Sequence, residues 1–408
     1  MSKIRIKNFG PIREGFNTDD GFMDIKKVTV FIGDQGTGKS AVAKLISTLS
    51  WMEKSLNRGD IHYFDGNNFS RFKEFVKYQG IEDYFLPNTE IEYIGEAYSF
   101  ELGKPPIIKE TKGNYRVPKI MYVPAERNFL STIQNAYDVT NLPKPLFTFG
   151  EELIRAQRNV DASGISLPIS KFRYQYDSST NTSFVSGIDH RINLLYASSG
   201  LQSAIPLFLV ARNLAYGVGS INGDSSIVLS LNQAARRNEE IVAAMQDASL
   251  EENERKNKIE NIYSKYHNTC FINIVEEPEQ NLFPTSQRNI LNSLLELANH
   301  NDGNKLIMTT HSPYIINYLS IAIQGEYLKQ KIYPELGRKH LFDRLCAVVP
   351  YKSTIAANEV AIYQLQKDGS INLLPNYEGI PSDKNYLNNS LAEGNELFDT
   401  LLEIEQEL

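Results

Sequence analysis

Cysteine, tryptophan and long apolar runs are scarce in this 408-residue chain. It has two cysteines, Cys270 and Cys346, and one tryptophan, and neither cysteine has the spacing of a metal-ligand set. We expect both thiols to stay reduced in the core, because the chain is large and shows no secretion signal. No apolar run approaches the about 20 residues that cross a bilayer. Residues 3–9 alternate apolar and charged side chains, as a strand does and a signal peptide does not. These absences predict a cytoplasmic protein with no membrane segment.

Positive charge is also in short supply. The formal net charge is −7, from 42 Lys and Arg against 49 Asp and Glu. A general nucleic-acid coat needs an overall basic surface, so this balance argues against one, although it leaves a local basic groove open. Hydrophobic residues make up 41% of the chain, which is enough for a sizeable core. We expect a globular protein whose direct nucleic-acid binding stays undecided.

Residues 33–40 read Gly-Asp-Gln-Gly-Thr-Gly-Lys-Ser and fit the phosphate-loop (P-loop) pattern G-x-x-x-x-G-K-[S/T]. The loop lies between an expected strand, residues 28–32, and a helical run, residues 41–49, as the mechanism requires. Glycines let backbone N–H groups curl around a phosphate, and the helix directs its positive end to the same place. Lys39 would reach the β- and γ-phosphates, and the Ser40 hydroxyl would bind Mg²⁺. We therefore predict an ATP site at Gly33, Asp34, Gln35, Gly36, Thr37, Gly38, Lys39, Ser40 and Ala41.

Strand and helix patterns divide the chain into four parts of one discontinuous domain. Residues 1–127 look strand-rich around the P-loop, and residues 128–232 look helical with breaks. Residues 233–268 are dense in charge and lack Pro and Gly, which predicts surface or projecting helices. Residues 269–408 return to strand–helix alternation, which favours parallel strands with crossover helices. A solvated helical pair at 233–268 and an oligomer or partner contact remain alternatives.

Two C-terminal strands each end in a candidate catalytic group. The apolar run 271–275 is followed by Glu276 and Glu277, and the run 305–310 is followed by His311. In P-loop enzymes an acid after an apolar strand helps to bind Mg²⁺, so Glu276 is predicted to bind the metal. A second acid beside it can polarise the attacking water, which is the role predicted for Glu277. His311 is predicted to sense the γ-phosphate.

Residues 198–202, Ser-Ser-Gly-Leu-Gln, resemble the L-S-G-G-Q signature of ABC-class ATPases at Ser199, Gly200 and Gln202. Alone, the stretch could be a helix N-cap. The order of P-loop, signature, acidic motif and His is also the order in that class. The resemblance implies an α/β fold: an ABC-class P-loop NTPase head with a mixed sheet around the P-loop helix, an antiparallel strand-rich lobe, and a helical signature lobe with a helical insertion. It also implies that ATP is sandwiched between two copies, with the P-loop of one facing the signature of the other.

The Glu-Glu-Pro-Glu motif and the variant signature resemble the SMC-like and OLD-type branches of this class. The opening residues 4–12, the P-loop and the segment 122–127 resemble the AriA family, the ATPase subunits of PARIS anti-phage defence systems. That resemblance implies a homo-oligomeric ATPase that holds a TOPRIM-type nuclease subunit (AriB-like) in check. It also implies release of the nuclease when a phage anti-restriction protein that mimics DNA is sensed.

Three other functions stay open. An SMC-like ATPase of DNA repair or chromosome maintenance usually inserts long coiled-coil arms, and no long heptad run separates Lys39 from Ser199. A transporter nucleotide-binding subunit fits the signature less well, and a nucleotide-gated binding module would show little turnover. OLD-type proteins with their own nuclease carry an Asp-x-Asp pair after the His motif, and none follows His311 here. We therefore expect no nuclease domain in this chain.

The C-terminal residues 391–408 contain six acidic side chains and no Lys or Arg. Leu397, Leu401 and Ile404 recur at helical spacing, so the segment is expected to be a helix. The favoured interpretation is a terminal helix docked on the core, and the second is a helix that contacts a partner.

Overall fold

A seven-stranded mixed sheet forms the centre of the protein in the computed structural model. The structure describes residues 2–60, 69–102, 107–111, 113, 115–133, 139–169, 171–219, 231–247, 249–332 and 338–406. Within them the sheet has the order β2 (Gly15–Phe16), β16 (Ser370–Leu373), β15 (Val360–Leu365), β4 (Val28–Gly33), β14 (Lys305–Thr310), β13 (Cys270–Glu276), β8 (Pro118–Val123). From β15 to β8 neighbouring strands are parallel, so their carboxyl ends meet at one edge.

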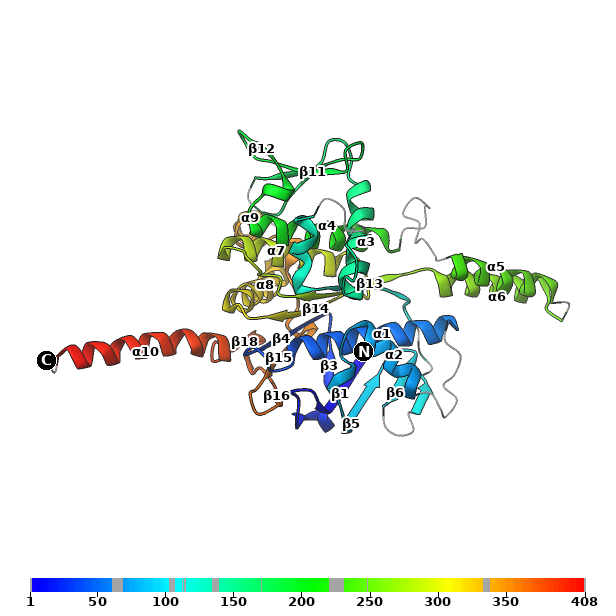
Figure 1. Ribbon diagram of the computed structural model, residues 1–408, viewed down its shortest axis with the longest axis horizontal. Helices are drawn as coiled ribbons and strands as arrows, with labels where there is room; N and C mark the ends of the chain where they lie inside the picture. The colour runs from blue at the N-terminus through cyan, green and yellow to red at the C-terminus, as the bar shows by residue number, and fades with distance from the viewer. Residues whose placement is uncertain are drawn as a thin grey trace.

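Alternate side chains of the central strands enter two different cores, because successive residues of a strand face opposite sides. Val28, Val30 and Ile32 of β4 lie in one apolar cluster, whereas Phe31 lies in the other. The first cluster contains α3 (Lys144–Arg158), α4 (Ser199–Gly217), α7 (Pro284–His300) and α8 (Pro313–Ile332). The second contains α1 (Lys39–Arg58) and α2 (Phe69–Tyr78). Figure 1 shows these helices on the two sides of the sheet.

The strands and helices predicted around the P-loop and the two C-terminal strands are confirmed. Helix α1 is longer than the predicted run 41–49 and ends where Gly59 adopts φ 72°, a left-handed cap that glycine favours. A five-stranded antiparallel sheet covers the far side of α1. Its order is β3 (Met23–Ile25), β1 (Ser2–Phe9), β5 (Phe85–Ile94), β6 (Tyr98–Glu101), β7 (Ile107–Glu110). The expected strand-rich lobe is thus an antiparallel sheet packed on the P-loop helix.

The helical expectation for residues 128–232 was wrong in one part. Between α3 and α4 the chain forms a four-stranded antiparallel sheet, ordered β12 (Arg191–Asn193), β11 (Thr182–Ser186), β10 (Arg173–Asp177), β9 (Ile165–Ser166). These segments form strands because their apolar side chains alternate with polar ones, and Tyr174 and Val185 are fully buried on the inner face of the sheet. Residues 220–230 of the expected lobe lie outside the described residues.

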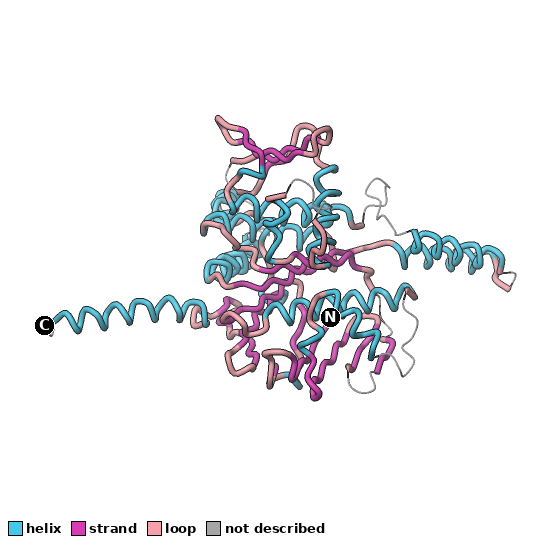
Figure 2. The backbone as a smooth tube through the Cα atoms, in the orientation of Figure 1, coloured by secondary structure: helices cyan, strands magenta, loops and turns pink. Residues whose placement is uncertain are grey.

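Two helical elements leave the body in opposite directions (Figures 1 and 2). Helices α5 (Leu231–Gln246) and α6 (Glu252–Tyr266) form a projecting pair, as predicted for the charged insertion. Helix α10 (Tyr386–Gln406) also projects, so the favoured expectation of a helix docked on the core was wrong. The remaining elements are α9 (Lys339–Val348), β17 (Asn376–Tyr377) and β18 (Ile380–Pro381). No helix in the described ranges is long and apolar enough to cross a membrane.

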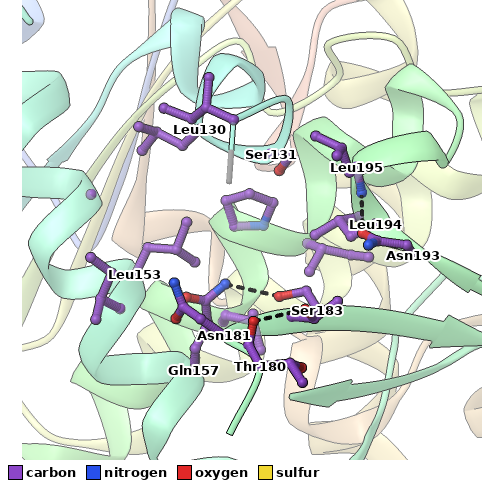
Figure 3. Close-up of a pocket in the computed structure, with 17 residues that line it drawn as sticks. Leu130, Ser131, Leu153, Gln157, Thr180, Asn181, Ser183, Asn193, Leu194 and Leu195 are labelled. Atoms are coloured by element: carbon purple, nitrogen blue, oxygen red, sulfur yellow. Dashed lines mark hydrogen bonds between the residues drawn. The ribbon is translucent and has the colours of Figure 1, made fainter. Parts of the chain in front are cut away.

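Helix α4 contains a proline, and a neighbouring hydroxyl compensates for it. Pro206 has no N–H to donate to the carbonyl of Gln202 one turn earlier. The Ser131 hydroxyl donates to that carbonyl instead, at 2.8 Å. Ser131 and Pro206 line a pocket of about 310 Å³ between α3, β11 and α4 (Figure 3). The pocket contains none of the predicted site residues.

Ser131→Ala should lower the free energy of unfolding by about 1–3 kcal/mol, because it leaves the buried Gln202 carbonyl unpaired. In a Pro206→Ala background the new N–H can take over that carbonyl, so the cost of Ser131→Ala should fall to below about 1 kcal/mol. Urea denaturation of the four proteins in this cycle measures the difference. Equal costs in both backgrounds would contradict the compensation.

Candidate nucleotide site

The P-loop connects the end of β4 to the start of α1, at the carboxyl edge of the parallel strands. Gly33, Gly36 and Gly38 have φ values of 149°, 78° and 101°, a region that side chains disfavour. A Cβ on Gly33 would also lie 2.5 Å from the carbonyl oxygen of Leu365. The Thr37 hydroxyl closes the loop by donating to the Asp34 carbonyl at 2.8 Å. These positions explain why glycine is needed at three places.

Lys39 is buried and folds back over the loop. Its Nζ donates to the carbonyls of Gly33 at 3.0 Å and Asp34 at 2.7 Å. Burial lowers the pKa of Lys39 to about 8, against the opposing charges of Glu277, Asp34 and Glu279. A phosphate oxygen is a stronger acceptor than a neutral carbonyl, so the ammonium is suited to bind one. Gln35 and Ser40 are exposed beside it, and Ala41 is buried.

Asp34 connects the P-loop to the C-terminal part of the chain. The Lys367 ammonium lies 2.8 Å from its carboxylate, and Tyr386, the first residue of α10, also hydrogen-bonds to it. Lys367, more than the tyrosine, holds the pKa of Asp34 well below its usual range. The base of α10 is therefore in contact with the P-loop.

Glu276 ends β13 and is buried. Its Oε2 accepts from the backbone N–H of Ala125 at 3.3 Å, whereas its Oε1 has no hydrogen-bond partner within the part of the chain that the structure describes. The Tyr122 hydroxyl lies close enough to feel this charge, which together with burial raises its pKa far above the usual range. A buried carboxylate oxygen without a donor fits a cation ligand.

Magnesium fits this arrangement better than a metal that needs a full set of protein ligands. Among the described residues, no group of three or more His, Cys, Asp or Glu side chains could hold a metal ion by itself. Mg²⁺ commonly binds through one or two protein oxygens, substrate phosphates and water. Glu276 and Ser40 could supply the protein oxygens.

Glu277 and His311 lie at the same edge, after β13 and β14. The Glu277 Oε1 lies 3.7 Å from His311 Nε2, and both side chains are more than a third exposed. Glu277 has φ 44°, which is unusual for a residue with a side chain and costs about 1–3 kcal/mol. Burial and the charge of Lys39 lower the pKa of His311, which favours the neutral imidazole. Backbone strain like that at Glu277 is typical of functional sites.

Arg127 fixes this strained turn, and sequence analysis assigned it no role. Its side chain is fully buried, and it donates to the carbonyls of Glu276 and Glu277, each at 2.6 Å. Its Nε also donates to the backbone carbonyl of Ser203 in α4, at 3.2 Å. Burial lowers the pKa of Arg127 to about 10, so it stays charged at neutral pH. The sequence signal was its place in the segment 122–127, which resembles the AriA family and follows the end of β8 at Val123.

Glu279 is the second residue without a predicted role. Its carboxylate accepts from the backbone N–H of His311 at 2.7 Å, and removal of this partly buried group from water raises its pKa. It thereby joins the turn after β13 to the turn after β14. Its place in the acidic motif was visible in the sequence, but its burial was not.

The signature residues lie at the start of α4. Ser199 is exposed in the first turn, and a Cβ on Gly200 would lie 2.7 Å from the carbonyl oxygen of Asn281. The Gln202 side chain points inward and donates to the carbonyls of Leu194 and Leu195. Its role in this protomer is thus structural, and its contact with nucleotide stays a prediction. Across the described ranges, no hydrogen bond or ion pair joins residues 198–202 to the P-loop.

One part of this chain matches a known protein family. Residues 129–316 match a family described as an AAA ATPase domain. No curated protein matches. Among solved structures, an SMC head bound to the C-terminal winged-helix domain of ScpA has a TM-score of 0.37 at 9% identity, covering 78% of this chain and 90% of that one. The SMC head domain from Thermotoga maritima has a TM-score of 0.35 at 13% identity, with the same coverage. A dimeric ATP-binding cassette bound to ADP and phosphate has a TM-score of 0.29 at 10% identity, covering 92% and 100%.

Likenesses this distant say nothing about ligands or partners. The glycine-rich turn between β4 and α1, the parallel strand order and the antiparallel lobe on α1 define the architecture without them. The matched family also covers the signature, the acidic motif and His311. The chain has an α/β fold with a mixed sheet around the P-loop helix, and residues 129–316 match a family described as an AAA ATPase domain.

Proposed function

We propose that this protein binds ATP with Mg²⁺ and hydrolyses it between two head-to-tail copies of the chain. One observation carries the proposal: Lys39, Glu277 and His311 come from three separate segments and converge at one edge of the sheet, where Glu277 Oε1 lies 3.7 Å from His311 Nε2 and its charge acts on Lys39. A cation for phosphate, a carboxylate for water and a neutral imidazole are the groups that ATP hydrolysis needs. Their convergence at a P-loop supports hydrolysis as well as binding.

Each residue has a distinct role in this proposal. Backbone N–H groups of residues 33–40 and the Lys39 ammonium bind the phosphates, and Ser40 and Glu276 bind Mg²⁺. The metal neutralises charge on the β- and γ-phosphates. The Glu277 carboxylate accepts a proton from the attacking water, and the His311 imidazole donates a hydrogen bond to the γ-phosphate.

Two copies are needed because the signature of a single protomer does not reach its own P-loop by any hydrogen bond in the described residues. Ser199 and the exposed amino end of α4 provide a second set of anion-binding groups. In a head-to-tail dimer they would face the partner's nucleotide. ATP would then hold the two copies together.

We further propose that this ATP-driven dimer controls a separate TOPRIM-type nuclease in anti-phage defence, with a DNA-mimicking phage protein as the trigger. The support is the resemblance of the P-loop and of residues 122–127 to the AriA family. The second candidate is an SMC-like ATPase acting on DNA. Native mass spectrometry after co-expression with the neighbouring gene distinguishes them: a stable complex with a nuclease subunit supports defence, and a bare ATP-dependent dimer contradicts it.

Glu277→Gln should lower kcat about 10²-fold or more, because the amide cannot accept the proton of water. The ATP Kd should change by less than about threefold, since the P-loop is intact. Phosphate release and ATP titration measure the two values, with the exposed Glu378→Gln as the matched control. Wild-type turnover in Glu277→Gln would instead indicate a nucleotide-gated binding module.

Lys39→Ala and Ser199→Arg should each abolish turnover, the first by losing phosphate binding and the second by obstructing the partner's site. An equal mixture should recover about a quarter of wild-type turnover, because about half of the dimers are mixed and each has one intact site. Steady-state hydrolysis after mixing measures the recovery. A mixture that stays inactive would place the whole site within one protomer.

Arg127→Lys should lower kcat about tenfold or more with little change in ATP Kd, because an ammonium cannot span the carbonyls of Glu276, Glu277 and Ser203 that the guanidinium joins. The matched control is Lys54→Met. Lys54 is also buried and donates to the Pro118 carbonyl and the Asn268 side chain, distant from the catalytic turn. Both variants should lose stability, but only Arg127→Lys should lose turnover. Parallel losses of kcat in both would mean that Arg127 acts through stability alone.

A further inference from the structure

Helix α10 leaves the body after a single anchored turn (Figures 1 and 2). The Tyr386 N–H donates to the Gln364 side chain at 2.8 Å, and the Asn385 side chain accepts from the N–H groups of Leu387 and Asn388. Leu387 is the last buried residue of the helix among those whose side chains are described. The remaining turns are surrounded by solvent.

The outer turns carry an apolar face. Leu397, Leu401 and Ile404 follow the i, i+4, i+7 spacing of a helix that inserts into a groove. Five large side chains lie on or beside this face and are 40–63% exposed: Leu397, Phe398, Leu401, Leu402 and Ile404. A single helix of 21 residues with an interior glycine, Gly394, is marginal in water. The helix would therefore be stabilised mainly by a surface that covers this apolar face.

The charges of α10 indicate what that surface is. Glu393, Glu396, Asp399, Glu403 and Glu405 are exposed, and no Lys or Arg lies between Leu387 and Leu408. Anionic lipids and nucleic acids would be repelled. A second copy of the helix is also disfavoured, since Glu405 lies one turn after Leu401 on the apolar face and would meet another acidic helix.

We propose that α10 docks in an apolar groove rimmed by Lys and Arg on a different protein. Leu397, Leu401 and Ile404 are the anchors, Phe398 fills the groove beside them, and the carboxylates pair with the basic rim. The proposal rests on this helix and is independent of the partner's enzymatic activity. Tyr386, at the base of α10, hydrogen-bonds to Asp34 of the P-loop, so the helix joins the docking face in its outer turns to the nucleotide site.

A photocrosslinker tests the occupant directly. The full-length chain with p-benzoylphenylalanine in place of Phe398 is expressed in its source cells, irradiated, and crosslinked peptides are identified by mass spectrometry. We expect a crosslink to another protein, mapped to an apolar groove with several Lys or Arg at its rim. The same probe at Tyr377, which is 79% exposed on the body, should give no such crosslink.

Second-site variants test the chemistry of the contact. Leu401→Asp should lower the crosslink yield at least about tenfold, as for an interface anchor. Glu396→Lys with Glu403→Lys should lower it at least about fivefold, because the charge pairing is reversed. Glu110→Lys, an equal type of charge reversal on an exposed strand, should leave it unchanged. All variants should keep wild-type ATP turnover, which separates docking from the nucleotide site.

Four results would overturn the proposal: no crosslink, a crosslink to a second copy of this chain, a lipid adduct, or a partner surface without basic residues. If neither the wild type nor any variant hydrolyses ATP, the ATPase proposal is overturned and the docking proposal is not. The crosslink result would still stand.

Discussion

The catalytic edge depends on one buried cation. Arg127 has no exposed surface, and its guanidinium donates to the carbonyls of Glu276, Glu277 and Ser203. Placing a charge in the core is costly unless every donor finds an acceptor. Two of the acceptors are the carbonyls of Glu276 and Glu277, and Glu277 has positive φ, so bonds that satisfy the arginine also hold the strained Glu277 backbone in place. Removing the guanidinium would release both.

The same residue connects two parts of the proposed enzyme. Ser203 belongs to α4, whose exposed amino end carries Ser199, whereas Glu276 and Glu277 follow β13. Arg127 thus contacts both α4 and the turn that positions the proposed base. In a head-to-tail dimer, α4 would face the partner's ATP while Glu277 acts on its own. Arg127 would then link the two nucleotide sites, and the Ser131 bond beside Pro206 would stabilise α4.

Sequence analysis found the parts of the fold that have strong local signals. Two apolar C-terminal strands and a charged helical pair were predicted, and both are confirmed. The glycine-rich turn between β4 and α1 was also predicted and is confirmed as a structural feature. The sheet of residues 165–193 was missed because its strands are short and its buried Tyr174 and Val185 are surrounded by polar residues. Arg127 and Glu279 were missed for another reason: their roles come from contacts with carbonyls and N–H groups distant in sequence, which no side-chain pattern records.

The two projecting elements show why only one of them needs a partner. Helices α5 and α6 cover each other: Ile241, Ala244, Ile262 and Tyr266 form their own small core, and Lys265 pairs with Glu240 across the two helices. Two helices can thus stand in solvent by burying their apolar faces mutually. Helix α10 has no second helix and no cation among its described residues, so nothing in the described part of the chain offsets the exposure of its apolar face or the repulsion among its carboxylates. A helix with these properties is stable in an extended position only when another surface supplies both the apolar groove and the positive charge.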